Sequence, residues 1–190
     1  GGRRGGRAGG LVMAGSAAVP VGQTNGGRVV ETLTPRVELW KRAPSTDGSA
    51  ESGPLVTKAA LERVKNYVEV GVKEGATLAV DGRGFKMQGY ENGFYMGGCL
   101  FDNVTRDMRI YKEEIFGPVL SVVRAHDYDE ALRLPSDHDY GNGVAIFTRD
   151  GDAARDFAAK VNVGMVGINV PIPVPVRYYT FGGWKRSGFG

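Results

Sequence analysis

The 190-residue chain has a single cysteine, Cys99, and two histidines, His126 and His138. One cysteine excludes an intrachain disulfide and a cysteine-rich metal site, and the two histidines lack the HExxH spacing of zinc proteases. No apolar run approaches the ~20 residues that cross a bilayer, and the first residues lack the apolar core of a signal peptide. These absences predict no metal site, no membrane partner and no secretion, with a location in the cytoplasm or the mitochondrial matrix.

Strong charge of one sign is also missing. The chain has 24 Lys and Arg against 21 Asp and Glu, for a net charge of +3. Such a balance does not indicate a nucleic-acid partner. Residues 1–10 are the exception, because they are glycine and arginine with one alanine. We predict a disordered or degenerate start there. The alternative is a short RNA-contacting tail, which would bind in a salt-dependent manner.

The remaining pattern alternates between strands and helices. Period-two apolar runs predict strands, and apolar residues three and four apart predict helices. The predicted strands cover residues 16–21, 77–80, 99–104, 119–124, 144–147 and 165–170, and the predicted helices cover residues 25–40, 57–74, 128–134 and about 150–161. Pro135 is expected to stop the helix that Asp127 caps. This order predicts an α/β fold with an open, largely parallel sheet flanked by helices.

Chemistry is concentrated in residues 112–119, which read Lys-Glu-Glu-Ile-Phe-Gly-Pro-Val. Alternation along an extended segment predicts that Glu114 and Phe116 lie on the same side. A carboxylate can accept hydrogen bonds from a ribose diol, and an aromatic ring can stack on a flat heterocycle. The pair therefore suits a nicotinamide riboside. The alternative is that Phe116 belongs to the core, that the glutamates are solvated and that the Gly-Pro pair is an ordinary turn.

The same block resembles the signature of the aldehyde dehydrogenase superfamily. Four further blocks, in the same order as in the family, lie at residues 89–93, 140–148, 167–175 and 181–183. The block at 167–175 is typical of the CoA-acylating branch that acts on methylmalonate semialdehyde. The resemblance implies that Glu114 binds the nicotinamide ribose of NAD and that Phe116 packs near the nicotinamide. It also places Asn169 and Phe181 near the aldehyde tunnel, although Asn169 could equally be a satisfied turn amide and Phe181 plain core.

The reaction that the resemblance implies is oxidative acyl transfer. A cysteine thiolate attacks the aldehyde, hydride passes to NAD, and CoA cleaves the thioester with loss of carbon dioxide. The thiolate is both a good nucleophile and the precursor of a reactive acyl group. NAD and CoA are thus the cofactors expected of the intact family.

This sequence departs from the family in three respects. The register set by residues 18–22 puts Val12 at the position of the nucleophilic cysteine, and Leu11 replaces the adjacent arginine. The half that carries the Rossmann-like cofactor domain has no counterpart, since no G-x-G-x-x-G follows a strand. The family's last segment, which adds a strand across a subunit interface, is also without a counterpart. A degenerate gene, a shortened polypeptide and an erroneous sequence each fit these departures.

Residues 11–190 are therefore expected to form a catalytic-domain-like fragment that is inactive alone. Binding of NAD or CoA by such a fragment is not expected to be strong. The alternative is a non-catalytic pseudoenzyme that associates with full-length subunits or with itself. Cys99 lies far from the block that should hold the nucleophile, and we interpret it as a buried structural thiol.

Overall fold

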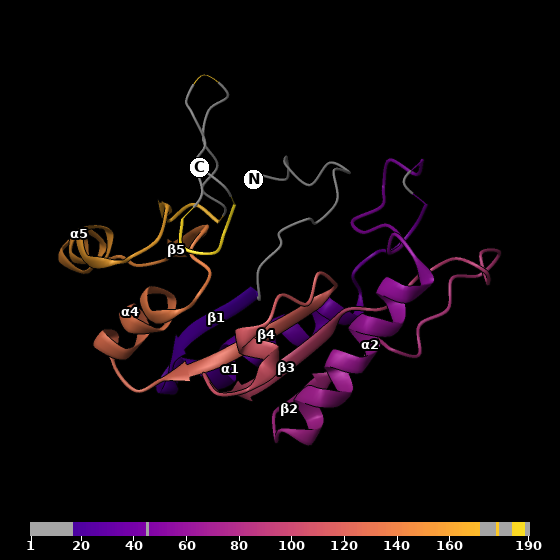
Figure 1. The fold of residues 1–190 in the computed structure, drawn as a ribbon, viewed down its shortest axis with the longest axis horizontal. Helices are drawn as coiled ribbons and strands as arrows, with labels where there is room; N and C mark the ends of the chain where they lie inside the picture. The colour runs from indigo at the N-terminus through magenta and orange to yellow at the C-terminus, as the bar shows by residue number, and fades with distance from the viewer. Residues whose placement is uncertain (1–16, 45, 172–177, 179–183, 189–190) are drawn as a thin grey trace. The chain divides into compact units, whose positions relative to one another are not determined.

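The structure, a computed structural model, describes residues 17–44, 46–171, 178 and 184–188 (Figure 1). The chain divides into two compact units, with the boundary between Arg124 and Ala125. The predicted glycine-arginine start, Val12 and Phe181 lie outside the described residues. Each helix among the described residues is too short or too polar to span a lipid bilayer.

The first unit is built on a four-stranded sheet. Its strands are β1 (Ala17–Gly22), β2 (Thr77–Val80), β3 (Cys99–Val104) and β4 (Val119–Ala125), in the order β1-β4-β3-β2. β3 and β4 run parallel, whereas β2 is antiparallel to β3. The α/β class is confirmed, and β2 makes the sheet mixed.

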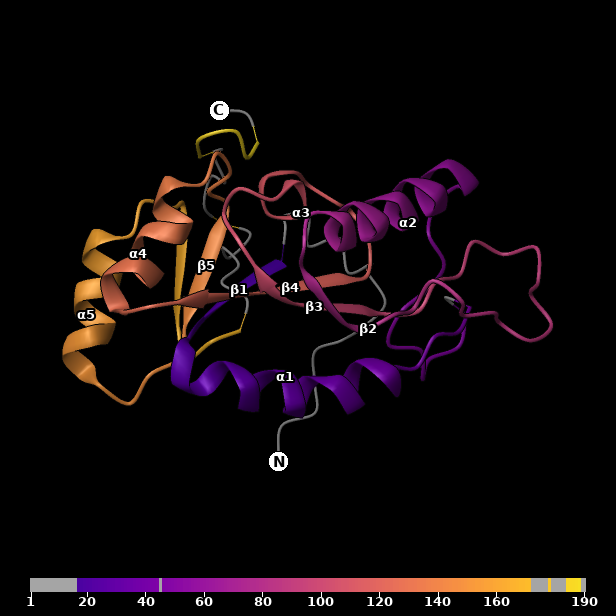
Figure 2. The same cartoon turned by 90° about the horizontal axis from the view of Figure 1, so that it is seen from below.

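Helices cover both faces of this sheet. Figure 2 shows α1 (Gln23–Glu38) on one face and α2 (Lys58–Lys73) with the short α3 (Arg109–Lys112) on the other. Successive side chains of β3 point in opposite directions, so this strand contributes core residues to both faces of the sheet. Leu100 belongs to the cluster that packs against α1, whereas Phe101 lies beside Gly71 of α2. Both side chains are fully buried.

Local sequence explains where α2 begins and ends. The Thr57 hydroxyl accepts a hydrogen bond from the Ala60 N–H at 3.0 Å, which satisfies one of the unpaired donors of the first turn. Gly75 follows the helix with φ +98, a left-handed conformation that costs glycine little. The apolar stripe predicted from the sequence includes the buried residues Leu61, Val64 and Val68.

The second unit contains one parallel strand pair with its crossover helix. β5 (Gly143–Ile146) and β6 (Met165–Ile168) pair in parallel, and α5 (Gly151–Lys160) connects them. Asp150 caps α5 by accepting from the N–H groups of Asp152 and Ala153. A parallel pair needs such a crossover, as the sequence pattern indicated.

The prediction that Pro135 stops the preceding helix was wrong. α4 (Tyr128–Asp137) continues through Pro135. The proline lies in the last turn, where its ring removes only one late hydrogen bond. The ammonium of Lys185 donates to the carbonyls of Pro135, Ser136 and His138 at 3.1, 2.6 and 3.0 Å. The carbonyls at the end of α4 are thus satisfied by a side chain that lies 47 or more residues away in the sequence.

Candidate functional site

Residues 113–118 connect α3 to β4 in the first unit. Ile115 is buried, whereas Glu114 is half-buried and Phe116 is 44% exposed. The alternative that Phe116 belongs to the core is therefore wrong. The segment is not uniformly extended, because Phe116 has a φ of +56, so a common side for Glu114 and Phe116 stays a prediction.

The backbone of Phe116 is unusual for a bulky residue. A left-handed φ brings Cβ close to the following carbonyl, and the cost is of the order of 1–3 kcal/mol. Such a conformation persists only where the surrounding structure holds it. The ring of Phe116 is thus presented to solvent by a constrained backbone.

The Tyr67 and Arg109 side chains bind the Glu113 carboxylate. The Tyr67 hydroxyl donates to Oε2 at 2.6 Å, and Nε and Nη2 of Arg109 donate to Oε1 and Oε2 at 2.9 and 3.0 Å. The Arg109 guanidinium, and next the Tyr67 hydroxyl, lower the pKa of Glu113 to about 2. In return, the hydrogen bond to Glu113 raises the pKa of Tyr67.

This network should make stability fall in acid. The pKa of Glu113 is lowered on folding from an ordinary 4.5 to about 2, so its contribution is complete above pH 4.5 and is lost as the pH falls toward 2. In Glu113→Gln this part of the acid dependence should vanish. Thermal unfolding followed by circular dichroism from pH 7 to pH 2 measures it. Glu62→Gln, an exposed carboxylate on α2, is the control and should keep the wild-type slope.

Glu114 contrasts with its neighbour. Among the described residues, none makes a hydrogen bond or ion pair with the Glu114 side chain. Its carboxylate is half-buried and retains its full capacity to accept hydrogen bonds. Of the two adjacent acids, Glu113 is used within the fold and Glu114 is available to a ligand.

Asn169, the predicted substrate contact of the second unit, makes a local pair of hydrogen bonds. Its Oδ1 accepts from the Thr148 N–H and its Nδ2 donates to the Thr148 carbonyl, both at 3.0 Å. The side chain thus ties the end of β6 to the residues after β5, with a φ of +55 that asparagine tolerates. This geometry is that of the turn amide considered above, and a substrate contact by Asn169 stays a prediction.

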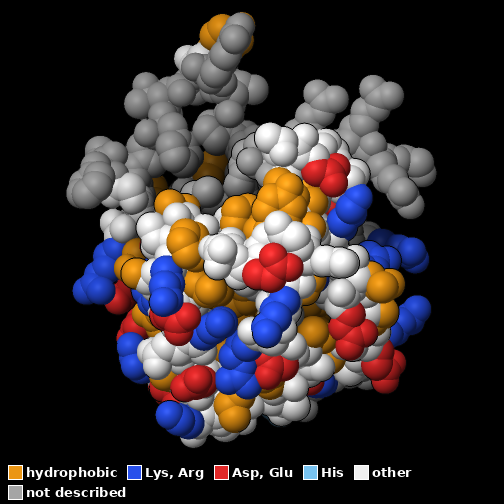
Figure 3. Space-filling model, turned by 90° about the vertical axis from the view of Figure 1, so that its right-hand side faces the viewer, with side chains coloured by type: hydrophobic (Ala, Val, Ile, Leu, Met, Phe, Trp, Pro, Cys, Tyr) orange, Lys and Arg blue, Asp and Glu red, His pale blue; other side chains and the backbone are white. Residues whose placement is uncertain are grey.

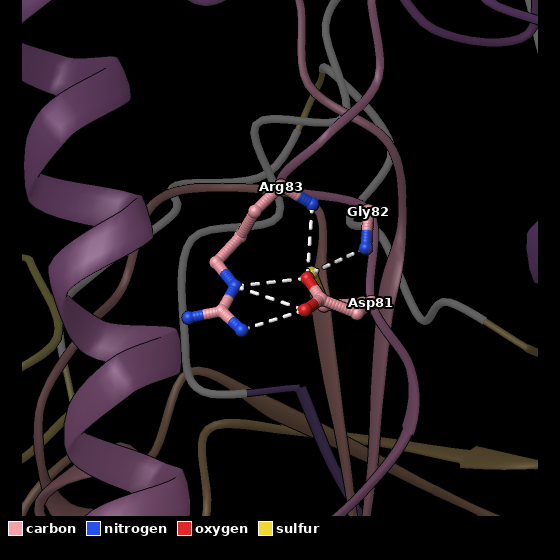
Figure 4. A network of polar contacts seen from close by, with 4 residues as sticks. Asp81, Gly82 and Arg83 are labelled. Carbon is pink, nitrogen blue, oxygen red and sulfur yellow. Dashed lines mark hydrogen bonds and ion pairs between the residues drawn. The ribbon is translucent and has the colours of Figure 1, made fainter.

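Cys99 is buried at the start of β3, as predicted for a structural thiol. It is 1% exposed, and the Gly82 N–H donates to its Sγ at 3.3 Å (Figure 4). Burial raises the pKa of the Cys99 thiol, which keeps it protonated. In the same view Arg83 pairs with Asp81 through both carboxylate oxygens. A protonated, enclosed thiol is unsuited to attack an aldehyde.

The described residues offer no metal site, and one face of the molecule carries charges of both signs. Among these residues, no group of three His, Cys, Asp or Glu side chains could hold a metal ion. The face drawn in Figure 3 interleaves Lys and Arg with Asp and Glu. Such mixing differs from the continuous basic surface that phosphate backbones require.

Tyr67 and Arg109 were not predicted to take part in the site. Tyr67 lies 46 residues before Glu113, and no local pattern marks that contact. Arg109 and Glu113 are four residues apart, which is the spacing of a helical ion pair and the one signal that could have indicated their contact.

Comparison with known proteins agrees with the signature in residues 112–119. Residues 10–190 match the family described as the aldehyde dehydrogenase family. A malonate-semialdehyde dehydrogenase of Pseudomonas aeruginosa is 55% identical over 178 residues, covering 94% of this chain and 36% of the relative. The acylating methylmalonate-semialdehyde/malonate-semialdehyde dehydrogenase of Bos taurus mitochondria is 44% identical, covering 96% and 34%.

A solved structure is similar to this chain in both sequence and fold. It is described as a methylmalonate-semialdehyde dehydrogenase of Sinorhizobium meliloti complexed with NAD, and it is 60% identical to this chain with a TM-score of 0.88. The match covers 92% of this chain and 36% of that one. The chain thus spans about a third of the length of these relatives.

Proposed function

Because the chain belongs to the aldehyde dehydrogenase family, we propose that it supplies part of the catalytic domain of a CoA-acylating, NAD-dependent oxidoreductase acting on methylmalonate or malonate semialdehyde. The substrate class rests on relatives that carry those names at 44% to 55% identity. The proposed location is the cytoplasm or the mitochondrial matrix, since the relatives include bacterial and mitochondrial enzymes.

One observation supports the cofactor role most directly. The half-buried carboxylate of Glu114, which has no partner among the described residues, stands two residues from the exposed ring of Phe116. Glu114 would accept hydrogen bonds from ribose hydroxyls, and Phe116 would pack against the nicotinamide. Bound NAD would supply the hydride acceptor, while these two side chains would orient its reactive end.

Binding of nicotinamide mononucleotide, which carries only the ring and its ribose phosphate, tests this assignment. Ligand-observed NMR on the 190-residue chain should detect weak, saturable binding. Glu114→Gln should weaken it about tenfold, because a charge-assisted hydrogen bond is lost, and Phe116→Ala about threefold to tenfold through lost ring contact. Glu62→Gln should leave binding unchanged. If the wild-type chain does not bind, or if both site variants bind like wild type, the assignment is wrong.

Turnover by this chain alone should be undetectable. Valine at position 12 offers no nucleophile, and the relatives contain about twice as much further sequence as this chain covers. With methylmalonate semialdehyde, NAD and CoA, neither NADH absorbance nor acyl-CoA in mass spectra should appear. Val12→Cys should not restore either product. Activity of the wild-type chain would contradict the inactivity, and activity of Val12→Cys would contradict the need for the remaining sequence.

A non-catalytic role in association with intact subunits is the second candidate. Its support is the second unit, where Phe147, Ile168 and Val170 are 66%, 43% and 51% exposed, and where the described residues form a two-stranded sheet. Two strands rarely form a stable sheet without further cover. Co-purification of the chain with a full-length relative would support this role, and a monomeric chain that captures no such subunit would count against it.

A further inference from the structure

The segment that carries Glu114 and Phe116 is attached to α2 at two points. At the first, the Tyr67 hydroxyl holds the Glu113 carboxylate at 2.6 Å. The guanidinium of Arg109 holds the same carboxylate from the α3 side and lies 5.8 Å from the centre of the Tyr67 ring. The backbone N–H of Arg109 in turn donates to Glu74, at the end of α2, at 2.9 Å. Glu113 is therefore fixed to both neighbouring helices.

The second attachment is a close steric contact. A Cβ on Gly117 would lie 2.5 Å from Cγ2 of Val64, so the backbone of the segment touches that side chain. Val64 is fully buried and has a stiff, β-branched side chain. Val64 and Tyr67 are three residues apart on α2, which places them on one helix face. Between the two attachments, Ile115 is 4% exposed and packs inward.

Two side chains of the segment, those of Glu114 and Phe116, take no part in these contacts. Glu113, Ile115 and Gly117 are held against the protein, whereas Glu114 is half-buried without a partner among the described residues and Phe116 is 44% exposed. The left-handed φ of Phe116 falls between the anchors at Ile115 and Gly117. A conformation that is costly by itself needs such neighbours to hold it.

We infer that Tyr67, Arg109 and Glu113 are positioning residues, which hold the segment 113–117 on α2 so that Glu114 and Phe116 present one preorganised surface to a nicotinamide riboside. The inference rests on the proposed function for its ligand, and on the contacts above for its geometry. An anchor that fixes the segment before the ligand arrives lowers the ordering cost of binding.

The test uses the full 190-residue chain and the variants Glu113→Gln and Tyr67→Phe. One readout is the intraresidue amide-to-Hα NOE of Phe116, which is strongest when φ is left-handed. The other is the affinity for nicotinamide mononucleotide. Each variant should weaken this NOE and lower the affinity about threefold to tenfold, as expected for one or two lost hydrogen bonds. Neither change alters Glu114 or Phe116.

Two further variants complete the experiment. Gly117→Ala should have the same two effects through the second attachment, whereas Glu62→Gln should have neither. Unchanged amide shifts in β3 show that a variant has kept its sheet, and Tyr67→Phe keeps the ring that a larger truncation would remove.

The outcomes distinguish the proposed cofactor role from the positioning role. If the wild-type chain does not bind the mononucleotide but the variants lose the Phe116 NOE, the cofactor role fails and the positioning role stands. If the wild type binds and the variants keep both the NOE and the affinity, the positioning inference is overturned and the cofactor role stands. Retention of the NOE in a folded Glu113→Gln chain overturns the inference even where no ligand binds.

Discussion

Replacing Phe101 with alanine is expected to lower the free energy of unfolding of the first unit by about 3–5 kcal/mol. Phe101 is among the largest side chains with no exposure in the described part of the chain. Its ring reaches Gly71 so closely that a Cβ there would lie 2.9 Å from Cζ, and Ile110 occupies the adjacent space. Because α2 and α3 already meet around the ring, they cannot close a cavity of that size without moving.

Native-state hydrogen exchange of the β3 amides measures this change, because those amides report on the sheet that the ring supports. Phe147→Ala is the control, since a side chain that is 66% exposed should contribute only about 0.5 kcal/mol or less. A loss below ~1 kcal/mol for Phe101→Ala would mean that the ring is not the centre of this layer.

The substitution Gly82→Ala should cost about 2–3 kcal/mol through steric conflict. A Cβ on Gly82 would lie 2.2 Å from the carbonyl carbon of Gly97 and 2.4 Å from its oxygen. Both are backbone atoms, so no side chain can rotate away. The two glycines are joined by a hydrogen bond from the Gly97 N–H to the Gly82 carbonyl at 2.8 Å, and the Gly82 N–H donates to Cys99. The new methyl group would strain or break both contacts.

Gly84→Ala provides a matched control two residues away. A Cβ there meets no atom within 4 Å, so the substitution should be neutral or slightly stabilising. Urea denaturation monitored by circular dichroism compares the two variants. Equal midpoints for Gly82→Ala and Gly84→Ala would show that the approach of the two backbone segments is loose in solution.

Sequence patterns located most elements because the signals for them are local. β2 and β3 have the predicted bounds, and the predicted helix at 57–74 differs from α2 by one residue at each end. The cap at Thr57 and the left-handed Gly75 act on adjacent residues, so a single sequence contains them. The short α3 was not predicted, since four residues are too few to show a period.

The wrong prediction at Pro135 arose because the deciding contact is not local. The sequence around it predicts a stop, but the ammonium that satisfies the end of α4 comes from Lys185. Local rules assume that a helix end must be satisfied by its neighbours. A distant donor that reaches the same carbonyls falls outside such rules.

By itself the sequence determined the α/β class and the family, because these depend on local periodicity and on short motifs, and it predicted Glu114 and Phe116 as the pair suited to a nicotinamide riboside. Only the tertiary structure showed that the two adjacent glutamates differ in their partners. Glu113 is bound by Tyr67 from 46 residues away and by Arg109, while Glu114 has no such partner among the described residues. Two identical side chains next to each other in sequence differ only in what the folded chain brings against them, and contacts between distant residues leave no local pattern.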